Sequence, residues 1–355
     1  MAAVRVLVTG GAGFVGSHVV DGLVARGDEV RSVDALLPGA HAGGRPDYLN
    51  PGAQFVHGDL RDEAVAAAAV RGVDAVCHQA SMVGLGSDVR DVADYVAHND
   101  LATAVLLRAL AQAGFAGRIV LASSMVVYGE GRYACADHGI ARPTPRSIAE
   151  LEAGRFEPRC PTCQRALTPQ AVPEDAPADP RNVYAATKLH QEHLCAAFAR
   201  ECDGVVVTAL RYHNVYGARM PRDTPYAGVA SILRSAVAAG RAPEVFEDGE
   251  QLRDFIDVRD VARANVLALT RAEGLAGPVN VATGQPRSVG QMAAALVAAA
   301  GPSAPPPRVT GAYRRGDVRH VFAAVDHARM ALGFDARIGL EEGMRDFATA
   351  QLRAT

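Results

Sequence analysis

Long apolar runs are missing from this sequence of 355 residues. A membrane-spanning helix needs about 20 consecutive apolar residues, and the alanine-rich segments 64–70 and 292–300 are too short, so no membrane partner is expected. Net charge is also small, at −3, which indicates no nucleic-acid partner. Cysteine is scarce, at six, and no charged leader precedes the first apolar strand. We therefore expect a cytoplasmic protein without a disulfide framework, long enough to bury a large core.

A glycine pattern follows the first apolar stretch. Residues 4–8 have the composition of a buried strand, and Gly10, Gly13 and Gly16 then lead into an apolar helix. Glycines at this spacing let the backbone turn sharply, approach a pyrophosphate closely and pack the helix on the strand. The phosphate would lie at the helix N-terminus. The pattern predicts a dinucleotide site, and the alternative is a glycine-rich turn without a ligand.

Acidic residues follow the next two predicted strands. Asp34 ends the strand at residues 29–33, where a carboxylate accepts both ribose hydroxyls of NAD and repels the 2′-phosphate of NADP. The sequence therefore favours NAD. Asp59 and Leu60 follow a further strand end and could meet the adenine, while the alternative for Asp59 is the N-cap of the helix that follows.

Strands and helices alternate as far as residue 210. A long helix is expected at residues 92–113, between apolar strands at 73–78 and 118–122, and a further strand at 205–210. Such alternation predicts an α/β fold with a Rossmann-type, doubly wound parallel sheet. Later elements shorten and prolines increase. We expect an NAD-binding domain over residues 1–211 and a smaller substrate-binding lobe over residues 212–355.

A tyrosine and a lysine stand four residues apart, at Tyr184 and Lys188. On a helix this spacing puts both side chains on one face. An ammonium near a phenol stabilises the phenolate, which lowers the pKa of the tyrosine and makes it a usable base. The pair predicts a catalytic site, and the alternative is a solvated helix face.

An insertion at residues 132–173 carries two pairs of metal-ligand residues: Cys135 with His138, and Cys160 with Cys163. Two pairs with two-residue spacers can present thiolates and imidazole tetrahedrally to zinc. Few apolar residues lie in this segment, so a metal would supply the free energy that organises it. We expect a structural zinc site resembling a zinc knuckle. The alternatives are reduced cysteines in a surface loop and a disulfide.

Ten motifs in order resemble one known family. They are residues 10–16, Asp34, 58–60, 78–81, 123–129, Tyr184 with Lys188, 210–217, 253–255, 280–284 and 315–317. The sequence is similar to the extended short-chain dehydrogenases/reductases of the NAD-dependent nucleotide-sugar epimerase/dehydratase family. The resemblance covers nearly the whole chain apart from the insertion.

This resemblance implies roles for individual residues. Ser124 would bind the reacting hydroxyl, Tyr184 would exchange its proton, and Lys188 would hold the nicotinamide ribose. The implied NAD-binding set is Gly10, Gly13, Phe14, Val15, Gly16, Asp34, Asp59, Leu60, Gln79, Ala80, Ser81, Asn99, Tyr184 and Lys188. The implied substrate-binding set is Ser124, Asn214, Arg253, Arg315 and Asp317. Asn214, Arg253 and an arginine at 314 or 315 would hold the diphosphate of a nucleotide sugar.

The residues beside Ser124 narrow the reaction. The 4,6-dehydratases of the family carry an Asp-Glu pair where this chain has Met125 and Val126, and decarboxylases usually carry a glutamate in place of Val126. Neither side chain can move a proton. We therefore expect a nucleotide-sugar 4-epimerase. The alternatives are a 4-ketoreductase and, outside enzymes, an NAD-binding sensor or scaffold that keeps the fold without the chemistry.

The cysteine-rich insertion resembles that of a bacterial branch of the family, the dTDP-L-rhamnose 4-epimerases. This implies dTDP-L-rhamnose or a related dTDP-hexose as the substrate. The insertion could fold over the sugar end of the cleft or serve the subunit interface. Family members usually pair through two long helices, here residues 92–113 and 183–202, so the resemblance also implies a homodimer.

Overall fold

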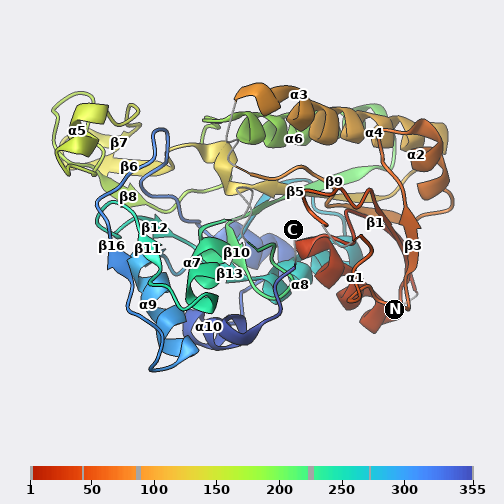
Figure 1. Cartoon of the computed structure of the whole chain (residues 1–355). Helices are drawn as coiled ribbons and strands as arrows, with labels where there is room; N and C mark the ends of the chain where they lie inside the picture. Colours follow the sequence, from red (N-terminus) through yellow and green to blue (C-terminus); the bar gives the residue numbers. More distant parts are fainter. Residues whose placement is uncertain (1–2, 42–43, 85–88, 223–227, 272, 354–355) are drawn as a thin grey trace.

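The computed structural model describes residues 3–41, 44–84, 89–222, 228–271 and 273–353. A seven-stranded parallel sheet forms its centre, in the order β14-β9-β5-β4-β1-β2-β3 (Figure 1). The strands are β1 (Arg5–Thr9), β2 (Glu29–Asp34), β3 (Gln54–His57), β4 (Ala75–His78), β5 (Arg118–Ser124), β9 (Val206–Tyr212) and β14 (Gly277–Val281). The predicted doubly wound α/β fold is confirmed. The strand order reverses between β1 and β4, and in such sheets ligands bind at the carboxyl ends near this point.

Helices cover both faces of the sheet (Figure 1). The helices α1 (Phe14–Arg26) and α8 (Val258–Thr270) share one apolar core with the sheet, which includes Leu23. A second core, which includes Leu106 and Leu110, lies on the opposite face. The helices there are α2 (Glu63–Ala69), α4 (Ala102–Gln112) and α6 (Val183–Glu201). Because both faces are covered, the inner strands are almost continuously apolar.

The single helix expected at residues 92–113 is interrupted. A short 3-10 turn η1 (Val89–Asp91) precedes α3 (Val92–Tyr95), a π-helical segment η2 (Val96–Leu101) follows, and α4 completes the run. Side chains from outside the segment bind the Asn99 carbonyl, which accepts hydrogen bonds from the Thr103 hydroxyl at 2.6 Å and the Gln191 amide at 3.3 Å. These side chains compete with the backbone N–H group that would bind the same carbonyl in a regular α-helix. Such competition favours the local change from an α-helical to a π-helical repeat.

The smaller elements after β9 form a second body beside the carboxyl ends of the large sheet (Figure 1). They are β10 (Asn214–Tyr216), α7 (Val229–Ala238), β11 (Glu244–Val245), β12 (Leu252–Arg253), β13 (Phe255–Asp257), β15 (Arg287–Ser288), α9 (Val289–Ala300), β16 (Arg308–Val309), η4 (Ala328–Leu332) and α10 (Leu340–Thr349). The strands pair as β10 with β13, β11 with β16 and β12 with β15. Two elements after residue 211 are part of the larger body: β14 joins the large sheet, and α8 packs against it. The division into residues 1–211 and 212–355 stays a prediction.

The insertion forms a small unit of its own at one end of the molecule (Figure 1). After η3 (Met125–Tyr128) it contains β6 (Arg132–Cys135), β7 (Gly139–Ala141), α5 (Ile148–Glu152) and β8 (Thr168–Gln170), with the sheet order β7-β6-β8. Among the described residues of the whole chain, no helix has the length and apolar character needed to cross a lipid bilayer.

Candidate active site

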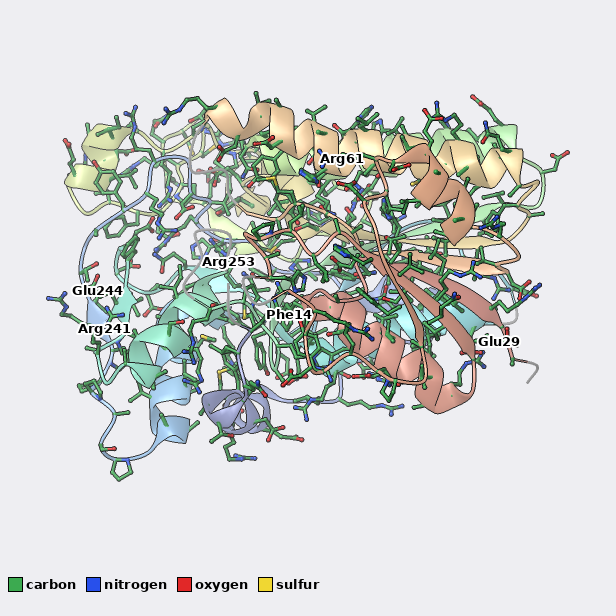
Figure 2. The ribbon with its side chains drawn as sticks, turned by 45° about the vertical axis from the view of Figure 1, so that its right-hand side comes forward. Phe14, Glu29, Arg61, Arg241, Glu244 and Arg253 are labelled. Atoms are coloured by element: carbon green, nitrogen blue, oxygen red, sulfur yellow. The ribbon has the colours of Figure 1, made fainter. Side chains whose placement is uncertain are left out.

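One cavity of about 940 Å³ lies between the carboxyl ends of the large sheet and the smaller elements. Figure 2 shows Phe14, at the start of α1, and Arg253, from the smaller elements, both near the middle of the molecule, and both line this cavity. Most predicted site residues line it as well: Gly10, Gly13, Phe14, Val15, Gly16, Asp34, Asp59, Leu60, Gln79, Ala80, Ser81, Ser124, Tyr184, Lys188, Asn214, Arg253 and Asp317. The cavity therefore gathers residues from segments that are far apart in the sequence.

The glycine-rich turn has the geometry of a phosphate cradle. Gly10 has φ +67°, which only glycine adopts without strain. A Cβ on Gly16 would stand 2.2 Å from the Gly10 carbonyl oxygen, so a larger residue cannot pack there. Asp34 braces the turn because its carboxylate accepts the Ala12 N–H at 3.0 Å and the Leu36 N–H at 2.9 Å. These residues fit a bound dinucleotide, with the pyrophosphate at the start of α1.

Two predicted cofactor residues have other partners. Asn99 does not line the cavity. Its side-chain oxygen accepts the Met82 N–H at 2.7 Å and the Ser81 hydroxyl at 3.0 Å, so it supports these two residues, which do line the cavity. Asp59 lines the cavity, but its carboxylate pairs with Arg61 at 2.6 Å. The alternative role of Asp59 as a helix cap is wrong, because Asp62 caps α2.

The residues Ser124, Tyr184 and Lys188 meet at the end of β5. Asn182 caps α6 by accepting the Ala185 N–H at 2.8 Å, and this start places Tyr184 and Lys188 on the buried face. The Lys188 ammonium donates to the Ala122 carbonyl at 2.9 Å and lies 5.8 Å from the centre of the Tyr184 ring. The arrangement unites a phenol, a hydroxyl and an ammonium in one cavity.

The pKa of Tyr184 differs from the expectation. Burial raises the pKa of the phenol, and the hydrogen bond with Ser124 opposes that rise only in part. Burial also lowers the pKa of Lys188 to about 7, although Asp100 and Glu192 favour its charged form. The predicted lowering of the tyrosine pKa by the lysine is therefore wrong for the protein alone, because desolvation outweighs the effect of the ammonium.

Replacing Lys188 with methionine should stabilise the NAD-free protein near neutral pH. An unfolded lysine keeps its proton up to about pH 10.4, whereas folded Lys188 loses it near pH 7. Between these values the unfolded state binds more protons, so the wild-type protein gains about 1.4 kcal/mol of stability per pH unit as pH rises. The methionine variant lacks this gain. Its advantage in urea unfolding should be largest at and below pH 7 and shrink towards pH 10, and a pH-independent difference would contradict the lysine's desolvation.

The neighbouring serines have separate roles. Ser123 donates to the carboxylate of Glu192, which also pairs with Arg211 at 2.8 Å, so it belongs to a buried structural network. Ser124 lines the cavity and also accepts the Val126 N–H at 3.4 Å. The side chains beside it, Met125 and Val126, line the cavity without any group that could transfer a proton.

Of the five predicted substrate residues, Ser124, Asn214, Arg253 and Asp317 line the cavity, whereas Arg315 does not. Arg253 is half-buried and donates to the carbonyls of Val318 at 2.7 Å and Arg319 at 2.8 Å rather than to a surface carboxylate. Asn214 and Asp317 line the cavity beside it. Arg315 is exposed and outside the lining, whereas its neighbour Arg314 lies within it, so the structure favours Arg314 at this position.

The four predicted metal ligands converge within the insertion. Their ligand atoms all lie within 4.8 Å of one another. The Cys135 sulfur is 3.4 Å from His138 Nδ1 and 3.6 Å from the Cys163 sulfur, and Cys160 is 3.7 Å from His138 Nδ1. Ligands of a tetrahedral zinc stand roughly 3.5–3.8 Å apart, so this set fits the metal. The three thiols and the imidazole lie close together, but the cysteines are free and no disulfide bond joins them. The disulfide alternative is therefore wrong.

Buried arginines attach the insertion to the wall of the cavity. The Arg319 side chain is 1% exposed and contacts Glu157 of the insertion at 2.7 Å, Glu247 at 2.8 Å and Asp248 at 2.7 Å. Arg146 of the insertion also contacts Glu247, at 2.8 Å. No described residue of the insertion lines the cavity itself. The insertion reaches the cavity through Glu247, which does line it.

Several lining residues had no signal in the sequence. Phe246 and Glu247 directly follow β11, and Arg353 comes from the far end of the described chain. None belongs to a recognisable motif, and each reaches the cavity only through long-range packing. A search for buried charged residues without local partners is the one approach that could have suggested them.

Comparison with known proteins decides the family. The family model described as "NAD dependent epimerase/dehydratase family" matches residues 6–148 and 163–282. The chain belongs to this family. The short unmatched stretch, residues 149–162, lies inside the insertion. The predicted enzyme class, an NAD-dependent epimerase, is confirmed.

Relatives of the family align over nearly the whole chain. A dTDP-L-rhamnose 4-epimerase of Burkholderia thailandensis is 32% identical, over 97% of this chain and 94% of that protein. The UDP-glucose 4-epimerase of Thermotoga maritima, solved with UDP-glucose, has a TM-score of 0.77 at 29% identity, covering 97% of both chains. The UDP-glucose 4-epimerase of Thermus thermophilus, solved with NAD, has a TM-score of 0.74 at 30% identity, again over 97% of both chains.

Proposed function

We propose that the protein is an NAD-dependent nucleotide-sugar 4-epimerase whose substrate is dTDP-L-rhamnose or a related dTDP-hexose. The observation that carries this proposal is the meeting of Ser124, Tyr184 and Lys188 in one cavity, beside the apolar pair Met125 and Val126. With bound NAD to accept and return the hydride, the first three would orient a carbinol and move its proton. The other two leave no acid or base for eliminating water or assisting decarboxylation.

The chemistry assigned to the chain is proton transfer and orientation. Bound NAD would accept and return a hydride, and its oxidised nicotinamide would favour the phenolate form of Tyr184. Tyr184 takes the proton of the sugar hydroxyl and later returns it, while Ser124 orients the oxygen. Lys188 holds a ribose hydroxyl and supplies positive charge. Because these groups are buried, water is kept from the ketone intermediate.

The nucleotide sugar is assigned from charge and from the relatives. Arg253 and Arg314 both line the cavity, and two guanidinium groups suit a diphosphate. Asn214 lies beside them, with a buried side-chain oxygen that has no partner among the described residues. The preference for dTDP rests on the relative from Burkholderia thailandensis and on the cysteine-rich insertion.

A panel of dTDP-, UDP- and GDP-hexoses, incubated with the purified protein and followed by NMR, tests this function. We expect isomers at C4 to interconvert with no cofactor added, fastest for a dTDP-sugar, because the hydride is returned in each turnover. Net oxidation of added NADH by a 4-keto sugar would indicate the ketoreductase instead. Retention of NAD without any turnover would indicate the sensor or scaffold.

We propose in addition that Cys135, His138, Cys160 and Cys163 bind one structural zinc ion. The separations between these ligand atoms support a tetrahedral site, and four protein ligands leave no open position for catalysis. Backbone N–H groups also support it: Asp137 and His138 lower the pKa of the Cys135 thiol, which favours the thiolate that binds metal. Elemental analysis should find about one zinc per chain.

We further propose a homodimer that pairs through the helical layer of α3, η2, α4 and α6. Large apolar side chains are exposed along this layer, with Val92 43%, Val96 44% and Leu101 50% exposed. A second copy covering them would remove apolar area from water. Light scattering in solution would measure twice the mass of the chain. A cytoplasmic location stays a prediction.

A further inference from the structure

The last described residue, Arg353, is fixed to the cavity mouth by its backbone. Its N–H donates to the Met220 carbonyl at 2.9 Å, and its carbonyl accepts the Arg222 N–H at 3.0 Å. A β-bridge joins it to Pro221. The segment therefore crosses from α10 to residues 220–222, and its position does not depend on the arginine side chain.

The guanidinium of Arg353 reaches the glycine-rich turn on the opposite wall. Nη1 lies 4.0 Å from the point where a Cβ on Gly13 would stand, and Gly13 is the residue that begins α1. Tyr48 lies beside it and donates to the Ala12 carbonyl of the same turn at 2.7 Å. Burial raises the pKa of Tyr48, and the positive charge of Arg353 opposes this rise. Two neighbours of the turn thus place the guanidinium at the N-terminus of α1.

The Tyr48 hydroxyl is hydrogen-bonded to this guanidinium, but two of the three guanidinium nitrogens have no partner among the described residues. Nε and Nη1 are shielded from solvent, and neither has a hydrogen-bond partner among the described residues. The nearest acid of the turn, Asp34, uses its oxygens for the N–H groups of Ala12 and Leu36. Desolvated charges are retained where an opposite charge binds them. The missing partner is therefore an anion that lies inside the cavity, between Arg353 and α1.

We propose that Arg353 binds the pyrophosphate of NAD and holds the cofactor in the cavity. The N-terminus of α1 and a guanidinium would then face the same phosphates, one from the large sheet and the other from the smaller elements. Retention matters for an enzyme that returns its hydride, since loss of the reduced cofactor would leave an unfinished ketone. This inference rests on NAD as the cofactor and is independent of the identity of the sugar.

The experiment compares Arg353→Gln, Arg353→Lys and the control Arg345→Gln, each purified as the full chain. Arg345 is exposed on α10 and does not line the cavity, so its replacement removes the same charge without touching the cofactor. We expect Arg353→Gln to weaken NAD binding roughly ten- to a hundredfold, the range for a lost hydrogen bond to a charged group. Arg353→Lys should lie between that variant and wild type. NAD content after purification and its dissociation rate during dialysis report the effect.

Two further measurements separate cofactor binding from folding. The melting temperature of the NAD-free protein should not fall in Arg353→Gln, because a partly unpaired charge is removed, whereas the rise in melting temperature on adding NAD should shrink. Equal NAD retention in Arg353→Gln and Arg345→Gln would overturn the proposal. A lower melting temperature of NAD-free Arg353→Gln, with an unchanged response to NAD, would also overturn it. Failure of every sugar to react would bear on the proposed function but not on this inference.

Discussion

Tyr184→Phe is expected to lower turnover by roughly 10²- to 10⁴-fold, the usual contribution of a general acid–base group. The variant loses only the hydroxyl that exchanges the proton, because its ring remains packed against Tyr95, with 6.2 Å between the ring centres. The fold should stay intact, and NAD should remain bound, since the glycine-rich turn and Asp34 are untouched. Single-turnover kinetics with the best sugar of the panel measure the loss.

A matched control for this variant is Tyr216→Phe. Tyr216 is fully buried, its hydroxyl has no partner among the described residues, and it lies outside the cavity lining. Removing that hydroxyl should leave turnover close to wild type. Near-normal rates for Tyr184→Phe would refute its assignment as the base, while equal losses in both variants would point to a general effect of the lost hydroxyl.

Cys160→Ser is expected to release the zinc and to raise KM for the nucleotide sugar about tenfold or more, with NAD content unchanged. The reason is the position of Glu157, three residues before Cys160. It contacts Arg319, and the Arg319 carbonyl holds the guanidinium of Arg253 at 2.8 Å. Without the metal, Glu157 loses its fixed position, so the diphosphate end of the cavity loosens. Elemental analysis, cofactor content and steady-state kinetics follow the three quantities.

The control for the zinc prediction is Cys202→Ser, at the end of α6 and outside the metal cluster. It should keep the zinc and the wild-type KM. Native protein without zinc would end the proposal of a metal site. Zinc loss from Cys160→Ser with KM unchanged would show that the insertion does not support the substrate end of the cavity.

Local motifs carried most of what the sequence could predict. The glycines at 10, 13 and 16 define a turn by their spacing, and Tyr184 with Lys188 share a helix face because four residues make about one turn. The predictions for the fold class and for the clustering of the metal ligands are confirmed for the same reason. Each depends on residues that are close in sequence or follow a regular repeat.

Predictions that depend on burial and on distant contacts were less reliable. The expected fall in the pKa of Tyr184 ignored desolvation, which depends on all the surrounding elements. The choice of Arg315 over Arg314 depended on the direction of one turn. The prediction that Asn99 binds the cofactor depended on a segment that is π-helical, which no local pattern indicated. Arg353 stands far from every motif, and only the bridge to Pro221 brings it to the cofactor site.

The pairing of Arg132 with Gln170, at the two ends of the insertion, has a consequence for how such enzymes diversify. The chain leaves and re-enters at neighbouring points, although the whole insertion, residues 132–173, lies between Ser124 and the approach to Tyr184. Loop length there costs little in closure entropy. A module at this junction can be exchanged for another, or for a short hairpin, while the reaction centre stays where it is.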